Sequence, residues 1–136
     1  MESVESTSRR MAAVRHEATS AEMALRRALR KERLLGYRVN LKTVLGAPDV
    51  AFTRWRVAVF VDGAFWHGHP RKFPETKMSD YWLKKIDRNR RRDRRVSRQL
   101  RRMGWQVLRF WDFDVERDPG RAVVRIRNAL RRAGSV

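Results

Sequence analysis

Residues 57–70 read VAVFVDGAFWHGHP, and the interpretation of the whole chain starts from this stretch. Five apolar residues at 57–61, with a β-branched valine at every second position, predict a buried strand. The strand runs directly into Asp62, a glycine, two large aromatic residues and His67 within a His-Gly-His sequence. Packing alone does not explain acid and imidazole side chains at such a place. The stretch therefore indicates a functional loop at a strand end.

The composition predicts a nucleic-acid partner. With 136 residues, 42% of them hydrophobic, the chain is expected to form one domain over residues 1–136, with short flexible ends. Thirty-three Lys and Arg against fifteen Asp and Glu give a net charge of +18, which repels itself unless a polyanion neutralises it. No apolar run approaches the ~20 residues of a membrane span, and MESVESTS lacks the order of a signal peptide. We expect a cytoplasmic, nucleoid-associated protein with no membrane partner.

The apolar spacing and the turn residues predict an α/β fold. Helices are expected at 20–35, 79–103 and 120–132, and strands at 37–41, 48–52, 56–61 and 105–111. The second and third strands are close enough for a hairpin. A strand, a crossover helix and a further strand imply parallel pairing with a right-handed connection. The prediction is a central mixed sheet of about four strands flanked by helices.

The long helix carries polar residues on its inward face. Its apolar stripe includes Trp82, Ile86 and Leu100, but Asp93 occupies an inward position between them. Burying a carboxylate is costly unless it is paired or coordinated. Two interpretations stay open: a salt bridge to one of the many arginines, or an active-site carboxylate. The opposite face carries eleven Lys or Arg between residues 84 and 102, a density that suits a phosphate backbone.

Glu22 and Asp49 are the other acidic candidates. Glu22 lies three residues after Thr19, so it belongs either to a helix-capping box or, at the inner edge of the apolar face, to an active site. Asp49 follows a proline, which alone is only a turn signal. The predicted hairpin, however, places Asp49 near the end of the strand that leads to His67. A carboxylate and a backbone carbonyl there can hold Mg²⁺, which prefers oxygen ligands.

Four ordered blocks together resemble a known family. They are PDV at 48–50, FVDGAFWHGH at 60–69, YWLKKIDRN at 81–89 with RRD at 91–93, and GWQVLRFW at 104–111. In this order and spacing they resemble the Vsr endonucleases of very short patch mismatch repair, over residues 7–113. The resemblance implies a restriction-endonuclease-like core and an enzyme that nicks double-stranded DNA beside a T·G mismatch. Related homing and mobile-element nucleases share its Glu, Asp, His, Asp set.

The resemblance also implies roles for individual residues. Asp49 is expected to bind Mg²⁺ together with the carbonyl of Val61. His67 is then the general base for the attacking water, Asp93 its supporting carboxylate, and Glu22 a group near the metal and the water. Phosphodiester hydrolysis needs such parts, because a metal neutralises charge on the phosphate and imidazole titrates near neutral pH.

The resemblance further predicts the DNA contacts. Phe65, Trp66 and Met11 match residues that wedge into the base stack at the mismatch, where unstacking costs least. The alternative is that the two aromatic residues are ordinary core residues. The outer face of the long helix supplies candidate phosphate contacts at Arg90, Arg91 and Arg94.

The chain departs from the family at the zinc site. Vsr proteins hold a structural zinc with cysteines and a histidine, but this sequence has no cysteine. It keeps only His69, with Ala64, Arg71 and Phe113 where the resemblance places thiolates. One imidazole cannot complete a tetrahedral site. We therefore expect no structural zinc, apolar packing of Ala64 and Phe113 in its place, and a hydrogen bond within the loop for His69. Asp62 is either a metal ligand or a cap of this loop, and the cap is favoured.

Two functions from different classes remain. The first is a Mg²⁺-dependent DNA endonuclease that cuts at a mismatch or at a specific site. The second is a non-catalytic DNA-binding module that kept the fold and the basic surface. The presence of Glu22, Asp49, His67 and Asp93 together favours the enzyme. We expect it to act as a monomer, with repair or mobile-element proteins as candidate partners.

Overall fold

The structure is a computed structural model that describes residues 20–64 and 79–135. Residues 20–31 are helical. The elements that follow are β1 (Arg38–Val39), β2 (Val50–Phe52), β3 (Val57–Asp62), α2 (Asp80–Arg102), β4 (Gln106–Trp111), α3 (Asp112–Arg117) and α4 (Pro119–Arg132). Among the described helices, none has both the length and the apolar character to cross a membrane.

The strands form one mixed sheet in the order β1-β2-β3-β4. β1 and β2 are antiparallel, as are β2 and β3, whereas β3 and β4 are parallel and are joined through α2. Val50 lies opposite Val59 in the hairpin, and Val61 lies opposite Phe110 in the parallel pair. The α/β fold, the hairpin and the parallel crossover predicted from the sequence are confirmed.

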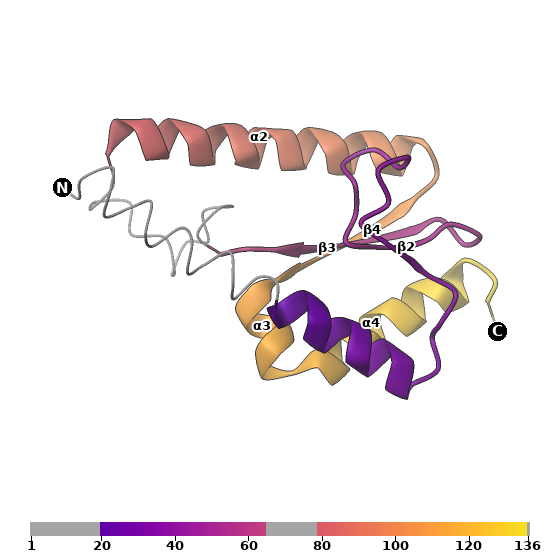
Figure 1. The fold of residues 1–136 in the computed structure, drawn as a ribbon. Coiled ribbons are helices and arrows are strands. Elements are labelled where there is room, and N and C mark those ends of the chain that lie inside the picture. Colours follow the sequence, from indigo (N-terminus) through magenta and orange to yellow (C-terminus); the bar gives the residue numbers. More distant parts are fainter. Residues whose placement is uncertain (1–19, 65–78, 136) are drawn as a thin grey trace.

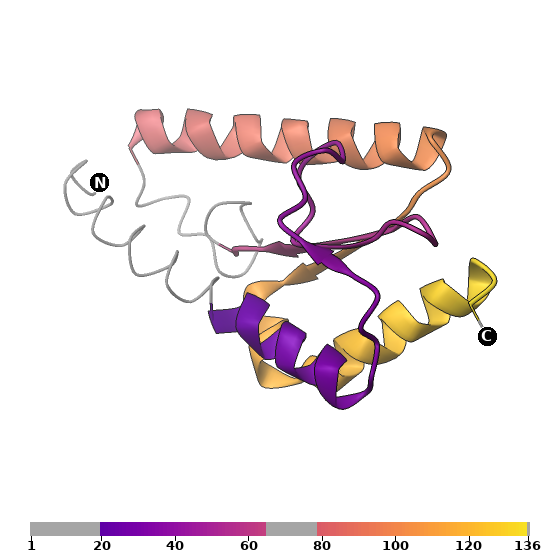
Figure 2. The ribbon, with the colours of Figure 1, turned by 45° about the vertical axis from the view of Figure 1, so that its right-hand side comes forward.

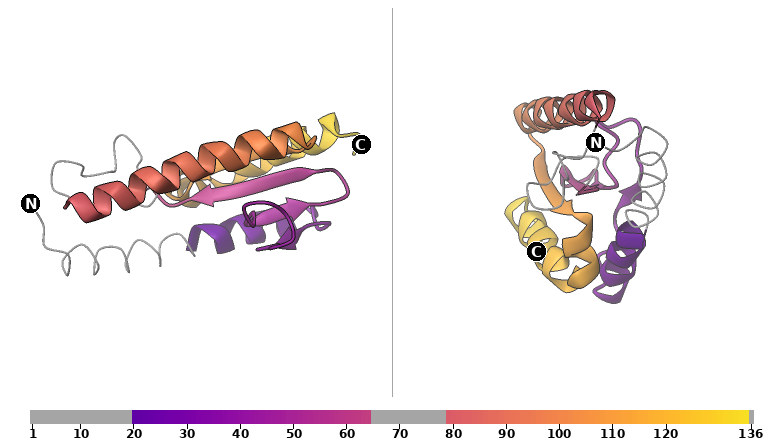
Figure 3. Two further views of the ribbon diagram at one scale, coloured as in Figure 1. Left: turned by 90° about the horizontal axis from the view of Figure 1, so that it is seen from above. Right: turned by 90° about the vertical axis from the view of Figure 1, so that its left-hand side faces the viewer.

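Helices cover both faces of the sheet (Figures 1 and 2). α2 lies alone on one face, and the helix at residues 20–31, α3 and α4 lie on the other, as the end-on view in Figure 3 also shows. Alternate residues of β3 serve the two faces. Val57 and Val59 belong to the large apolar cluster beneath the three helices, whereas Phe60 belongs to a smaller cluster with Leu100 of α2. β3 is buried along its whole length.

α2 has the predicted inner face and C-terminal stop. Trp82, Ile86 and Leu100 are buried. After the helix, Gly104 adopts a φ of +89°, and the amide of Trp105 donates to the carbonyl of Leu100 at 3.0 Å, which closes the last turn. Ser79 stands at the N-cap position, but its side chain makes no capping hydrogen bond.

The main differences from the predicted elements concern the first helix, β1 and α3. The first helix ends at residue 31 rather than 35, because Arg33 adopts a φ of +59° and the amide of Leu34 donates to the carbonyl of Leu29 at 2.9 Å. β1 spans two residues rather than five, since Asn40, at a φ of +47°, turns the chain away. α3 was not predicted, because its six residues are too few to show a helical period.

The loop between β1 and β2 rises from the sheet to α2 (Figures 1 and 2). Gly46 sits at the point of contact with a φ of +80°. A Cβ atom on Gly46 would lie 2.5 Å from a methyl carbon of Val96 and 3.4 Å from the ring of Phe60. Glycine is therefore required for both the backbone conformation and the space. This close approach sets the path of the chain into Asp49.

Gly46→Ala should destabilise the fold by about 1–3 kcal/mol, because it adds a positive-φ penalty to a steric clash. Gly36→Ala is the matched control, since no atom lies within 4 Å of its added Cβ. It should change stability by less than about 1 kcal/mol. Urea unfolding followed by circular dichroism measures both variants, and equal stabilities for the two would contradict the packing assigned to Gly46.

Candidate active site

Asp49 lies directly before β2, beside the end of β3. Because Val50 pairs with Val59, the hairpin register places Asp49 opposite Phe60, next to Val61. The amide of Val61 donates to Asp49 Oδ2 at 2.6 Å. The predicted proximity of Asp49 and Val61 is confirmed. The Val61 group in this hydrogen bond is the amide, and the metal-binding role of its carbonyl remains a prediction.

Glu22 reaches the same place from the helix at residues 20–31. Burial, the negative charge of Asp49 and a hydrogen bond with Asp49 together raise the pKa of Glu22 from 4.5 to about 7, while Arg26 opposes the shift. Arg26 Nη2 lies 3.9 Å from Glu22 Oε2. Two carboxyl groups this close favour a shared proton or a cation between them. The capping-box alternative depends on Thr19, which lies outside the described residues.

A pocket of about 160 Å³ lies between the end of β3 and α2. Asp49, Asp62 and Asp93 line it, together with Arg92 and Arg109. Two larger hollows, of about 480 and 580 Å³, are lined by residues of the helical layer and contain none of the predicted catalytic residues. The convergence of carboxylates, rather than volume, therefore identifies the candidate site.

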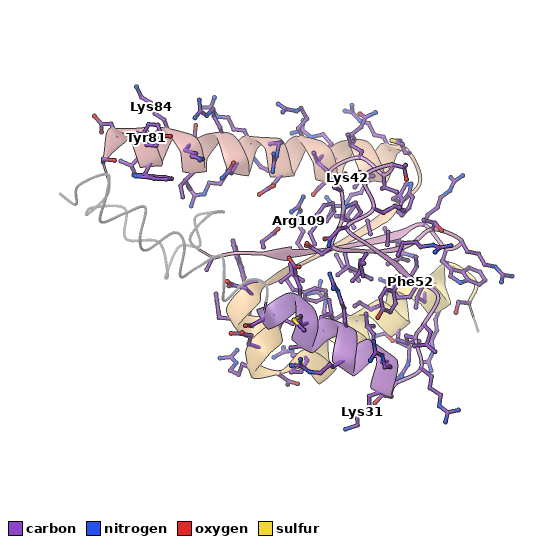
Figure 4. All side chains as sticks on the ribbon, viewed as in Figure 1. Lys31, Lys42, Phe52, Tyr81, Lys84 and Arg109 are labelled. Carbon is purple, nitrogen blue, oxygen red and sulfur yellow. The ribbon has the colours of Figure 1, made fainter. Side chains whose placement is uncertain are left out.

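Asp93 lies on the inward side of α2 and has an arginine partner. Arg109 Nη1 is 3.9 Å from Asp93 Oδ1 and donates to Asp62 Oδ1 at 2.9 Å. Asp93 therefore forms an ion pair with an arginine, as one of the two interpretations predicted. It also lines the same pocket as Asp49. Figure 4 shows the labelled Arg109 between the sheet and α2.

Arg109 is not among the site residues predicted from the sequence. Its position in a predicted strand, on the same face as Val107, was the available signal, because an arginine facing a covered sheet surface needs acidic partners. The nearest of these partners is Asp62, which was expected to cap the loop after β3.

Asp112 caps the described start of that loop, and the capping role of Asp62 remains a prediction. Its Oδ1 accepts hydrogen bonds from the amide of Ala64 at 3.3 Å and from the amide of Phe113 at 2.8 Å. Asp112 is only 4% exposed, and Ala64 is buried as expected, whereas Phe113 is half-buried. A buried carboxylate therefore joins the two segments. The predicted absence of zinc and the role of His69 remain predictions, since His69 and Arg71 lie outside the described residues.

Other predicted residues divide into two groups. Met11, Phe65, Trp66 and His67 lie outside the described residues, so their roles stay predictions. The arginines predicted to contact phosphates lie on α2, where Arg91 and Arg94 are exposed and Arg90 is half-buried. Arg91 pairs with Asp87 at 3.0 Å, an exposed ion pair too weak to exclude a phosphate. In Figure 4 the labelled Lys84 points away from the sheet.

The raised pKa of Glu22 predicts a pH-dependent stability for the metal-free protein. Between pH 4.5 and about 7 the folded state binds more protons at Glu22 than the unfolded chain does. The stability from this group is therefore fully present below pH 4.5 and is lost as the pH rises through 7. Relative to Glu22→Gln, the wild type in EDTA should lose about 1–3 kcal/mol of unfolding free energy across this range.

Urea titrations at several pH values test this dependence. Glu116→Gln, which changes an exposed carboxyl group, is the control and should follow the wild type. Parallel pH profiles for the wild type and Glu22→Gln would show that Glu22 is not the titrating group.

Comparison with known proteins places this site in a family. The family described as DNA mismatch endonuclease Vsr matches residues 3–72. Type II nicking enzyme V.NmeDIP of Neisseria meningitidis serogroup C is 41% identical over 118 residues, covering 85% of this chain and 79% of that protein. V.NaeI of Lentzea aerocolonigenes, also a type II nicking enzyme, is 42% identical over 125 residues, or 86% and 74% of the two chains.

A mismatch endonuclease is among the relatives as well. DNA mismatch endonuclease Vsr of Escherichia coli strain K12 is 35% identical over 108 residues, covering 77% of this chain and 68% of that protein. The family match includes the β-hairpin, and the three relatives are aligned over 77–86% of this chain. The chain therefore belongs to the Vsr family of DNA endonucleases.

Proposed function

We propose that this protein is a Mg²⁺-dependent endonuclease that nicks duplex DNA by phosphodiester hydrolysis, beside a T·G mismatch or at a specific site. The main support is the pair formed by Glu22 and Asp49 against Val61, at a pocket that also receives Asp93. Membership of the Vsr family agrees with this chemistry, and the names of the relatives include both nicking enzymes and a mismatch endonuclease.

The residues at this place fit Mg²⁺. The described residues contain no group of three or more acidic, His or Cys side chains arranged to hold a metal. Mg²⁺ does not need one, because it keeps several waters and binds through one or two carboxylates and substrate phosphates. Asp49 and the backbone oxygen of Val61 would hold the ion, with Glu22 beside them. When bound, it would neutralise charge on the scissile phosphate.

The side chains of the protein supply the proton transfer and the orientation. His67 is the general base: a ring nitrogen takes a proton from water as the water oxygen forms a bond to phosphorus and the P–O ester bond breaks. The departing ester oxygen takes a proton from solvent. Asp93 accepts a hydrogen bond from the other ring nitrogen and stabilises the imidazolium. Its place on α2, over the pocket that Asp49 lines, supports this assignment.

The basic face of α2 is the proposed phosphate-binding surface. Arg91 and Arg94 project from this exposed face, and Arg90 lies at its edge. Such contacts are independent of base sequence and strongly salt-dependent. Recognition is assigned instead to Phe65, Trp66 and Met11 as wedges in the base stack. The non-catalytic DNA-binding module remains the second candidate, because the basic face would serve it equally well.

Asp49→Asn and His67→Ala should each reduce the cleavage rate by at least about a hundred-fold, because each removes a group that acts in the hydrolytic step. DNA affinity should change by less than about three-fold, and EDTA should abolish cleavage by the wild type. The measurement is single-turnover nicking of end-labelled duplexes, with every mismatch and a matched sequence in the panel. Asp87→Asn, on the exposed side of α2, is the control.

Wild-type rates in either variant would refute the site. If no duplex in the panel is cut while all are bound, the DNA-binding module becomes the correct function.

The variants Arg94→Ala and Trp66→Ala should distinguish phosphate contacts, which are the same for every duplex, from contacts that select the substrate. Arg94→Ala should weaken binding to every duplex alike and lower the slope of log affinity against log salt by about one. Trp66→Ala should weaken binding to the true substrate selectively, because only a poorly paired or deformable step unstacks cheaply. Fluorescence anisotropy measures both, after circular dichroism has shown that the variants fold. Equal losses on all duplexes for folded Trp66→Ala would return this residue to the core.

A further inference from the structure

Arg109 connects β4, β3 and α2 through one side chain. Its Nε donates to Ser97 Oγ at 2.8 Å, its Nη1 to Asp62 Oδ1 at 2.9 Å, and its Nη2 to the backbone carbonyl of Asp93 at 3.4 Å. The guanidinium carbon lies 4.1 Å from the centre of the Phe60 ring. Planar stacking and a fork of directed donors hold this group in one orientation. Because Asp93 and Ser97 are four residues apart, Arg109 forms hydrogen bonds with two successive turns of α2.

Among the described residues, the apolar cluster between α2 and the sheet lies towards the C-terminal end of the helix. The apolar cluster on this face consists of Ala58, Phe60 and Leu100, with half-buried neighbours that include Val96. Its contacts with α2 therefore lie in the C-terminal third of the helix. Towards the N-terminus, the next buried apolar residue on the inner face is Ile86. Between Ile86 and Val96 lies Asp93, which Arg109 connects to Asp62 of β3.

The ion pairs of Arg109 are unequal. Asp62 Oδ1 receives a hydrogen bond at 2.9 Å, whereas Asp93 Oδ1 lies 3.9 Å from the same nitrogen. Asp62 therefore acts as the main counter-ion. At the longer distance Arg109 attracts the Asp93 carboxylate without a hydrogen bond from Nη1. The two carboxylates are 11% and 17% exposed, so solvent screens these interactions less than it would at the surface.

We propose that Arg109 is a positioning residue for Asp93. It fixes the rotation of α2 through Ser97 and the carbonyl of Asp93, and it draws the Asp93 carboxylate towards the pocket that Asp49 lines. Asp62 balances its charge. This inference rests on the proposed nuclease function, in which Asp93 orients the general base.

Arg109→Lys should test this role, because lysine keeps the charge but cannot bond to three partners in one plane. Single-turnover nicking at saturating duplex should slow by about ten- to a hundred-fold, as expected when a catalytic group moves by about 1 Å. The dissociation constant for DNA should stay within about two-fold. Arg125→Lys is the matched control, since Arg125 also stacks on a β4 ring, that of Phe110, at 4.8 Å, but outside the pocket.

Combination with Asp93→Asn distinguishes positioning from direct contact with the phosphate. If Arg109 acts through Asp93, Arg109→Lys should lose most of its effect in the Asp93→Asn background. An undiminished effect there, or a loss of DNA affinity that matches the loss of rate, would overturn the proposal.

A crystal structure of Arg109→Lys decides the inference independently of activity. The Asp93 carboxylate should move by about 1 Å or more relative to Asp49. An unmoved Asp93 would overturn the positioning role even if the wild type proves to be an active nuclease. If instead the wild type cuts no duplex, the proposed function fails and the position of Asp93 still tests Arg109. If Arg109→Lys does not fold, the crystal structure of Asp62→Asn is determined in its place. The same displacement of the Asp93 carboxylate relative to Asp49 is expected there.

Discussion

β3 is buried on both faces and hydrogen-bonded along both edges, and the other elements take their positions from it. Antiparallel pairing with β2 brings Asp49 to the end of β3, while parallel pairing with β4 requires a crossover, which α2 provides. At 23 residues α2 is about 34 Å long, well over the length of a six-residue strand. It therefore continues past the end of β3, as Figures 1 and 3 show, and its central residue Asp93 shares a pocket with that strand end.

Charge is arranged differently on the two sides of α2. The whole chain carries +18, and the exposed side of α2 holds much of its basic character. The side that faces the sheet is acidic, with Asp93 near Asp49 and Asp62. Asp62 is paired with Arg109, and Asp49 accepts a hydrogen bond from the amide of Val61. Burial and the neighbouring Asp49 raise the pKa of Glu22 to about 7, so this group is partly protonated at neutral pH. The basic, exposed side of α2 attracts a polyanion. The acidic side that faces the sheet attracts a cation, which can also bind the phosphates of that polyanion.

The parts that the sequence predicted were those that depend on local pattern. Period-two and period-3.6 apolar spacing identified β3 and α2, and the hairpin register placed Asp49 beside Val61. Arg109 was missed because strand alternation was its one local signal among 33 Lys and Arg residues, and its partner Asp62 is 47 residues away in sequence. The helix end at Arg33 was missed because its positive φ occurs in a residue that is not glycine.

The two faces of the sheet differ in how firmly their helices are attached. Among the described residues, the face with α4 is covered by a continuous apolar cluster, whereas α2 contacts the small cluster around Phe60 and the polar groups of Arg109. Local stability follows buried apolar contact, so the α2 layer should open at a lower free energy than the opposite layer. In the proposed function, a duplex bound to the basic side of α2 would stabilise the arrangement in which α2 packs on the sheet. DNA binding and the placement of Asp93 beside the pocket would then be thermodynamically linked.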